Sequence, residues 1–519
     1  MQNYSRINPL NSKEIMQYDI PMLVNIIKKQ LTPNSFEHCK YVQELVELCK
    51  TNSVSHSSFP ELQKKFVNST YKTYLIVDWE KYHGKEMYKF NNRKEYEKLK
   101  EAEIRNSFIF KNRDEIINFY KTFVYLKNNT EKNWYYNRSI DFIIDENYTR
   151  SFQVGCELLQ IIIKNDNEVE YIPEVFFSNQ LKKRKNADII WNIIEENDFF
   201  RKPLWELSFY VFLDNSLLNI VDIKSLINTI RCMNNIEIIR FYNLKKFLVF
   251  KPDLFQIILK IIVDKYEKEG IKIRICEDTF SEYFDLLGTD ILLIKKAYIQ
   301  QVKIYNYFDY EGKGMLNILK KNSNFLIEYT KSLYDVKQFS VFDKSKRLEY
   351  IWQVEEIEKT LITVFDFMSE KEPYLGLGEH SGNAFFQNLQ GEQKEKASKF
   401  LLNYVKTNFK NPKKMSIVIN IATKSMVELL DEIILLFLSL TQDKNIFAKI
   451  IWSGGPSVYV GDVNIWDIRA ANWRNILSIV EKSRMGISLI PIKQFINNEI
   501  EYSLELADKE RKRKFLEGD

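Results

Sequence analysis

Residues 426–440 read MVELLDEIILLFLSL, and this stretch has the clearest helical period in the chain. Apolar residues recur there at spacings of one and three, as they do along one face of an α-helix. The stripe comprises Met426, Leu429, Leu430, Ile433, Ile434, Phe437 and Leu438. Ser425, three residues before Glu428, predicts a capping box at the helix start. Leu435 and Leu436 lie outside the stripe, so we expect the second half of this helix to be buried on nearly all faces.

Helices of the same kind are predicted at residues 222–233, 252–269 and 345–368. Each segment has apolar residues at helical spacing. In the second of them, Pro252 suits the first turn, where its missing N–H is not needed, and Gly270 suits the left-handed residue that follows a helix. Helices of about 12–24 residues joined by short polar loops pack as antiparallel hairpins.

Glycine and proline are scarce in this chain. Its 519 residues include 15 glycines and 11 prolines, below the average usage of about 7% and 5%. Sheet-rich folds use both residues in their tight turns, so the scarcity favours helices. No fixed repeat period of about 34 or 40 residues is present. The sequence therefore predicts a mainly α-helical fold, an irregular array of helical hairpins similar to an α-solenoid.

The N-terminal third is less clearly helical. Residues 71–79 (YKTYLIVDW) and 139–144 are rich in β-branched and aromatic side chains, which are typical of strands. We favour helices here because the rest of the chain has a helical pattern, and a small α+β element is the alternative. A polar run at 164–170, before Pro173, is one candidate boundary, and the helix-breaking residues gathered in 369–396 are the second. These boundaries predict an N-terminal domain at 1–170, a central helical array at 171–370 and a C-terminal helical domain at 371–519.

The charge and the cysteines limit the class of protein. The chain has 75 Lys and Arg against 70 Asp and Glu, a net charge of +5, whereas dedicated nucleic-acid binders are usually far more basic. Five isolated cysteines, with no CxxC pair, favour buried reduced thiols over a disulfide framework. The N-terminus has no signal pattern, and no apolar stretch approaches the roughly 20 residues of a membrane span. We expect a cytoplasmic protein without membrane contact.

No motif for metal or nucleotide chemistry is present. The four histidines, His38, His56, His83 and His380, have no second histidine at metal-ligand spacing. A phosphate-binding loop ends in GK followed by Ser or Thr, whereas EGKGM at 311–315 has Gly314 at the hydroxyl position. We expect no metal and no cofactor, and we favour a protein that is not an enzyme. The alternative, an enzyme whose active site is formed by residues far apart in the sequence, is not excluded by the sequence.

Several acidic and basic residues support a second hypothesis, that the protein binds nucleic acid or is a nuclease. The acidic groups with residue types that could hold a divalent cation are Asp366 with Glu392 and Lys394, Asp78 with Glu80 and His83, and Asp141 with Asp145. We interpret them as surface acids in a chain with 70 of them. The candidate phosphate contacts are Lys182, Lys183, Arg184 and Lys185, together with the run at 509–514. A solvated loop and tail are the alternative interpretation.

The loop at 452–462, WSGGPSVYVGD, is the candidate ligand-binding segment. Gly454 and Gly455 would let a ligand approach the backbone, because glycine has no side chain there. Arg469 and Arg474 on the predicted helix that follows would supply positive charge. A structural loop between two helices is the alternative.

Two stretches resemble the C-terminal helical arrays of bacterial STAND-type NTPases, which are large antiphage sensors. The first is YFDYEG at 307–312 continuing to FLIEY at 325–329, and the second is SGGP at 453–456 with the helix that follows, to 491. The nucleotide-binding core and the effector domain of that family are missing here. The resemblance implies target recognition by a helical array, and it implies no catalytic residues.

Together these observations favour a non-enzymatic recognition or scaffold protein. Its expected partner is another protein, for instance an NTPase, an effector or a phage protein in a bacterial antiphage system. A nucleic-acid-binding or nuclease-like effector is the alternative.

Overall fold

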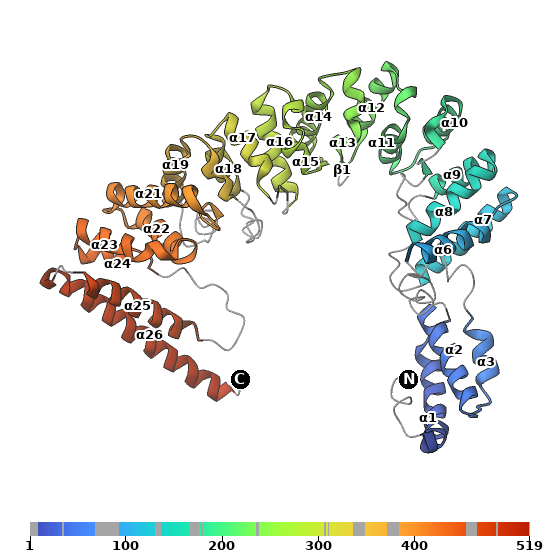
Figure 1. The fold of residues 1–519 in the computed structure, drawn as a ribbon, viewed down its shortest axis with the longest axis horizontal. Helices are drawn as coiled ribbons and strands as arrows, with labels where there is room; N and C mark the ends of the chain where they lie inside the picture. The colour runs from blue at the N-terminus through green and yellow to red at the C-terminus, as the bar shows by residue number, and fades with distance from the viewer. Residues whose placement is uncertain are drawn as a thin grey trace. The chain divides into compact units, whose positions relative to one another are not determined.

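The computed structural model describes residues 9–33, 36–67, 93–129, 136–165, 176–177, 180–234, 238–305, 308–309, 311–335, 348–370, 384–452, 464–483 and 486–517. Within these ranges there are 23 α-helices and two short strands, and the helices follow one another in order (Figure 1). The prediction of a mainly α-helical array is confirmed. The chain divides into two compact units, residues 1–233 and 234–519. The three predicted domains stay a prediction.

In the first unit, helices pack mainly on the helices next to them in the chain. Its helices are α1 (Pro9–Gln30), α2 (Phe36–Thr51), α3 (Phe59–Lys65), α6 (Arg93–Ser107), α7 (Arg113–Asn129), α8 (Tyr136–Arg150), α9 (Phe152–Lys164), α10 (Arg184–Glu195), α11 (Lys202–Phe212) and α12 (Ile220–Cys232). α1, α2 and α3 share one apolar core. α6 and α7 pack on α8 and α9, and α9 to α12 continue the series. Burial of one face of each helix against its neighbours stabilises such an array.

The second unit is built in the same way. Its helices are α13 (Phe241–Leu244), α14 (Leu254–Glu269), α15 (Asp278–Ser281), α16 (Ile291–Ile304), α17 (Lys313–Lys321), α18 (Phe325–Asp335), α19 (Ile357–Glu370), α21 (Gly391–Asn408), α22 (Pro412–Lys424), α23 (Leu430–Leu440), α24 (Lys444–Lys449), α25 (Ile465–Lys482) and α26 (Ile490–Glu517). Buried aromatic rings recur along its core, and the ring of Phe400 packs against both Trp352 and Phe365.

A small parallel sheet interrupts the helices of the second unit. β1 (Ile238–Ile239) pairs with β2 (Arg274–Ile275), and α13 and α14 form the crossover between them. The buried Gln301 on α16 accepts from the Ile275 N–H at 2.8 Å and donates to the Ile273 carbonyl at 2.9 Å. Its amide therefore satisfies backbone groups at the open edge of β2.

The strand alternative for the N-terminal third is wrong where it can be checked. Residues 139–144 lie within α8, and Ile140, Ile143 and Ile144 are buried on one face of that helix. Residues 71–79 lie outside the described residues. A helix buries β-branched side chains as well as a strand does when they recur at helical spacing.

Two predicted helices are confirmed, with small corrections at their starts. α12 begins at Ile220, where Asn219 and Asp222 form a capping box that was not predicted. α14 begins at Leu254, so Pro252 precedes the helix and does not lie in its first turn. Gly270 ends α14 with φ +70°, a left-handed conformation that glycine adopts without steric cost.

Two other helices differ from their prediction. Over 345–368 the described residues form a 3₁₀ turn, Glu349–Gln353, and then α19 from Ile357, with Glu356 at φ +53° between them. The predicted helix at 426–440 begins as a 3₁₀ turn at Val427–Leu429 and becomes α-helical at Leu430. The predicted N-cap is wrong, since Ser425 ends α22 and the residue that precedes the 3₁₀ turn is Met426, whose side chain makes no capping hydrogen bond.

Along the described parts of the chain, no helix is both long enough and apolar enough to cross a membrane. Of the five cysteines, Cys39, Cys49 and Cys156 are buried, Cys276 is half-buried and Cys232 is exposed, and all are free thiols. The expectation of buried thiols is therefore wrong for Cys232, which ends α12.

Candidate functional site

The predicted ligand-binding residues are only partly within the described structure. Gly454 and Gly455 lie outside the described residues. The Nη2 atom of Arg469 on α25 donates to Glu499 on α26 at 2.8 Å, and its guanidinium lies 5.7 Å from the centroid of the Trp466 ring. Arg474, further along α25, is exposed. Arg469 thus connects the two C-terminal helices, and the structure does not bring it together with Arg474.

The predicted phosphate contacts surround the start of α10. Lys182, Lys183 and Lys185 are exposed there. Arg184 lies 2.8 Å from Asp188 and 3.2 Å from Asp222, and it also donates to the Leu217 carbonyl. Its guanidinium therefore ties α10 to the start of α12.

The two arginines of the second basic run also pair with the chain's own acids. Arg511 on α26 lies 2.7 Å from Asp467 on α25 and 2.9 Å from Asp508. Arg513 lies 4.0 Å from Glu510. These pairs reduce the positive charge that the run presents to a phosphate backbone.

The nuclease-like group at 366, 392 and 394 is not assembled. Asp366 on α19 accepts from Lys414 at 2.6 Å and from the Tyr404 hydroxyl at 3.1 Å. Lys394 pairs with Glu428 at 2.7 Å, and Glu392 is exposed in the first turn of α21. Asp366 and Lys394 therefore pair with other residues and not with each other, and the described residues contain no cluster of three or more His, Cys, Asp or Glu that could hold a metal.

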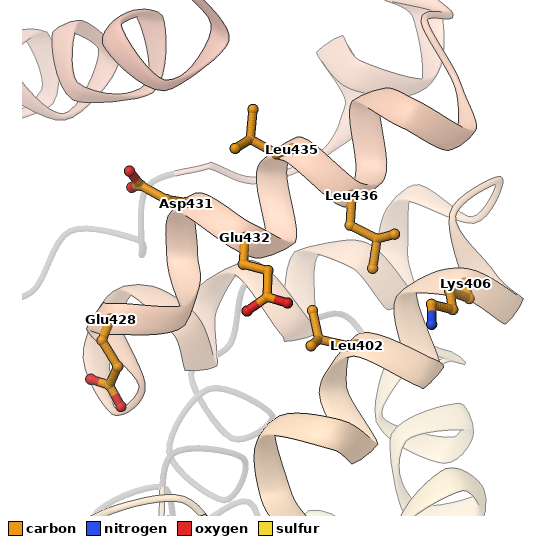
Figure 2. A pocket seen from close by; sticks show the side chains of 7 residues that line it. All are labelled: Leu402, Lys406, Glu428, Asp431, Glu432, Leu435 and Leu436. Atoms are coloured by element: carbon orange, nitrogen blue, oxygen red, sulfur yellow. The ribbon is translucent and has the colours of Figure 1, made fainter. Parts of the chain in front are cut away.

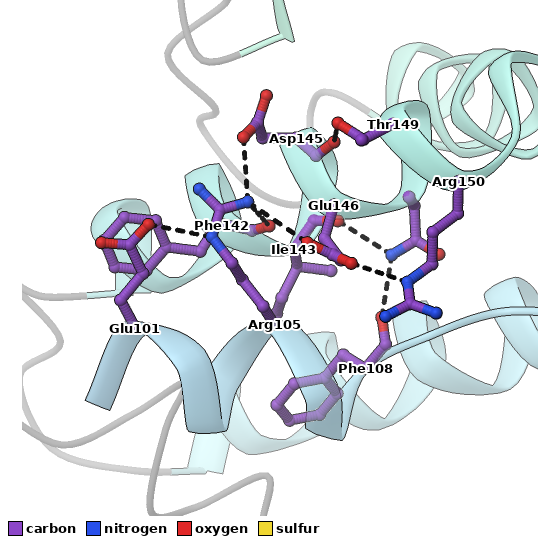
Figure 3. Close-up of polar contacts among 10 residues, drawn as sticks. Glu101, Arg105, Phe108, Phe142, Ile143, Asp145, Glu146, Thr149 and Arg150 are labelled. Atoms are coloured by element: carbon purple, nitrogen blue, oxygen red, sulfur yellow. Dashed lines mark hydrogen bonds and ion pairs between the residues drawn. The ribbon is translucent and has the colours of Figure 1, made fainter. Parts of the chain in front are cut away.

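The acids at 141 and 145 surround an arginine. Arg105 on α6 donates to Glu101 and to Asp145 on α8, both at 2.9 Å, and its guanidinium lies 5.2 Å from the centroid of the Phe142 ring (Figure 3). Burial, and then repulsion from Asp145, raises the pKa of Asp141, while Arg105 acts in the opposite direction. The cluster connects α6 to α8. The third acidic group, Asp78, Glu80 and His83, lies outside the described residues.

The two described histidines accept hydrogen bonds from the backbone. His38 Nδ1 accepts from the Thr32 N–H, and His56 Nδ1 accepts from the Ser58 N–H, both at 3.1 Å. His83 and His380 lie outside the described residues.

The glycine-rich segment near 311–315 is closed by the chain itself. The buried carboxylate of Asp309 accepts from the Gly314 N–H at 3.0 Å, the Met315 N–H at 2.8 Å and the Tyr298 hydroxyl at 2.6 Å. It therefore occupies the helix N-terminus where an anion would otherwise bind. A Cβ at Gly314 would come within 2.7 Å of Phe280 Cβ. In this chain Asp309 of the YFDYEG stretch is therefore a buried helix cap.

A surface hollow between α21 and α23 remains as the candidate site. It has a volume of about 550 Å³ and is lined by Leu402, Lys406, Glu428, Asp431, Glu432, Leu435 and Leu436. Figure 2 shows Glu432 and Leu436 on the side of α23 that faces Leu402 on α21, with Lys406 at the far end. The three leucines are half-buried. An apolar floor with charged residues at its edge is typical of protein-binding surfaces. We call this feature the α21–α23 hollow.

The charges at the edge of the α21–α23 hollow are of two kinds. Glu428 pairs with Lys394, which lowers the pKa of Glu428, and Asp431 pairs with Lys482 at 3.1 Å. Glu432 and Lys406 form no ion pair with any residue in the described part of the chain. One negative and one positive charge are thus available at this edge.

This site was not predicted from the sequence, because Leu435 and Leu436 were expected to be buried in the core. The fully buried residues of α23 are those of the predicted stripe, such as Ile433, Ile434 and Phe437. The signal was present: the apolar run is wider than one helix face, and a second apolar face can serve a partner as well as a core.

Comparison of the chain with protein-family models, with curated proteins and with solved structures found no match.

Proposed function

We propose that the protein is a non-enzymatic helical scaffold that binds a partner protein in the α21–α23 hollow. The observation that carries the proposal is that three half-exposed leucines line the hollow: Leu402 and Leu436, which face one another in Figure 2, and Leu435. Each leucine that moves from water into an interface contributes favourable free energy, on the order of 25 cal/mol per Å² of apolar surface buried.

The hollow favours one kind of occupant, an amphipathic helix of the partner. Such a helix presents apolar residues at spacings of three and four, which would lie on the three leucines. Basic residues on one edge would face Glu432, and acidic residues further along would face Lys406. This complementarity selects the orientation of the helix more than it adds affinity.

The experiment compares proteins captured from lysate of the native host by tagged full-length variants. Leu436→Glu places a charge among the leucines of the hollow, so we expect at least a tenfold loss of the specific partner, roughly the effect of burying an unpaired charge. Leu292→Glu is the matched control, because Leu292 lies on α16, is 64% exposed and does not line the hollow.

Charge reversal then tests the mode of binding. Glu432→Lys should weaken the captured partner when the two proteins are purified and mixed, and a Lys→Glu change on the partner's helix should restore binding. Equal capture by wild type, Leu436→Glu and Leu292→Glu would reject the hollow as the binding site.

We also propose that the protein acts in bacterial antiphage defence. The resemblance to antiphage sensors supports a role in bacterial defence, and the same setting places the protein in the cytoplasm, where its thiols would stay reduced. Loss of the gene should then raise the plating efficiency of at least one phage, and complementation with Leu436→Glu should fail where Leu292→Glu succeeds.

A further inference from the structure

The first helix has an apolar face that does not belong to the core. Ile15, Tyr18, Met22 and Ile26 of α1 are 37%, 84%, 58% and 40% exposed. At about 100° per residue they lie within roughly 80° of arc. We call them the α1 stripe. The core residues of α1 lie on the opposite side of the helix and are Met16, Ile20, Val24 and Ile27. One helix therefore has two apolar faces, of which the described structure covers one.

The spacing of the α1 stripe fits a second helix. Ile15, Tyr18 and Met22 are three and then four residues apart, which is the spacing of a coiled-coil seam. Paired with an identical antiparallel helix, Tyr18 would face Met22 of the partner subunit, and Ile15 would lie within one residue of the level of Ile26 of the partner subunit. The stripe is thus complementary to itself, as a twofold interface must be.

The charges beside the α1 stripe favour the antiparallel arrangement. Glu14 is exposed on one flank of the stripe near its start, and Lys29 is exposed just past its end. In an antiparallel pair Glu14 would come within reach of Lys29 of the partner subunit, twice over, whereas a parallel pair would bring like charges together. Neither residue forms an ion pair with another residue that the structure describes, while the neighbouring Lys28 is already held by Glu61 at 3.0 Å.

We infer that two copies of the chain associate through antiparallel pairing of their α1 stripes. One helix face buries less surface than the roughly 1,200–2,000 Å² that stable complexes bury, so we expect a weak dimer whose population rises with protein concentration. It is independent of the α21–α23 hollow. A scaffold that dimerises in this way presents two hollows, which raises its effective affinity for a partner with two binding segments.

Sedimentation of the full-length protein from about 1 to 100 µM tests the inference. Wild type should shift toward the mass of two 62.1 kDa chains as its concentration rises. Met22→Glu should weaken the association by roughly tenfold or more, because it buries an unpaired charge. Gln17→Glu adds the same charge at an exposed position of α1 outside the stripe and should leave the association unchanged.

Charge reversal separates this pairing from other modes. Glu14→Lys and Lys29→Glu should each weaken association several-fold, and the double variant should restore it. A monomer across the whole concentration range, or equal association of wild type and Met22→Glu, would overturn the inference. So would α1-dependent binding to phosphatidylglycerol vesicles without self-association, which would make the stripe a membrane-surface helix.

Discussion

Gly155 on α9 lies directly against the ring of Tyr148 on α8. A Cβ built at Gly155 would fall 2.6 Å from Cε1 of that ring and closer still to two other ring atoms. α8 and α9 are consecutive helices, and this close approach is one of the contacts that pack them together. Glycine is needed here because of the space available, since its φ is not in the left-handed region.

Gly155→Ala should destabilise the first unit by about 1–3 kcal/mol, since the added methyl forces the two helices apart. Faster hydrogen exchange of the α8 and α9 amides would report this local change. Gly391→Ala is the control, because nothing lies within 4 Å of a Cβ there and the only strain is its φ of +52°. Unchanged exchange in α8 and α9 would contradict the packing described here.

Asp141→Asn should stabilise the protein near neutral pH. Burial, and then repulsion from Asp145, raises the pKa of Asp141 above its usual 3.8, so the folded state holds the proton more tightly than the unfolded chain. The favourable contribution of the protonated group is complete below the unfolded pKa and is lost as pH rises through the folded pKa. Asparagine avoids that loss, on the order of half a kcal/mol at a partly exposed site.

Urea unfolding at several pH values measures this effect. The advantage of Asp141→Asn should vanish as the pH falls below the unfolded pKa of Asp141, near 3.8, because the aspartate is then protonated, and neutral like asparagine, in both the folded and the unfolded state. Asp145→Asn serves as the opposite control, because it removes the 2.9 Å ion pair with Arg105 and should destabilise. An Asp141→Asn variant that is less stable than wild type at pH 7 would show that Asp141 is a favourable partner of Arg105.

At the scale of single elements, the start of α17 shows how a short motif acts through hydrogen bonding. Three donors converge on the Asp309 carboxylate. Asp309 itself has φ +51°, and Gly312 has φ +69°. The loop is therefore arranged to place one buried acceptor over the first turn of α17, which compensates the unsatisfied N–H groups of that turn.

Asp309→Asn should destabilise the second unit by about 1–3 kcal/mol, because the new NH₂ group must face one of three donors. Asp290→Asn is the matched control. Asp290 caps α16 through one exposed contact with the Leu293 N–H, and asparagine caps a helix equally well. A loss of stability that is equal in the two variants would argue against the buried role of Asp309.

The elements also show what the sequence could and could not predict. The stripes of α12 and α14 were predicted correctly, because each helix has one clear apolar face and a recognisable end. The break at Glu356 was not, since a single residue in the left-handed region has no marker when it is not glycine or asparagine. The start of α23 was predicted wrongly because Ser425, which was expected to cap that helix, is instead the residue that ends α22.

At the scale of the whole molecule, packing is mostly between helices that are close in the chain. Each helix in such an array has few neighbours, so a helix with two apolar faces leaves one of them at the surface. This is the case for Leu435 and Leu436 on α23 and for the α1 stripe. The sequence marks both faces as apolar, but which face meets the core depends on neighbours that only the fold supplies. For that reason the candidate site could not be placed from sequence.

A photo-crosslinking amino acid at position 436 tests the central claim most directly. Placed in the full-length protein in native cells and irradiated, it should give a discrete crosslinked product with a partner protein, and the same amino acid at position 292 should not. Peptide mapping of that product should place the crosslink in an amphipathic helix of the partner. Absence of a product at 436, or the same product at both positions, would contradict the account.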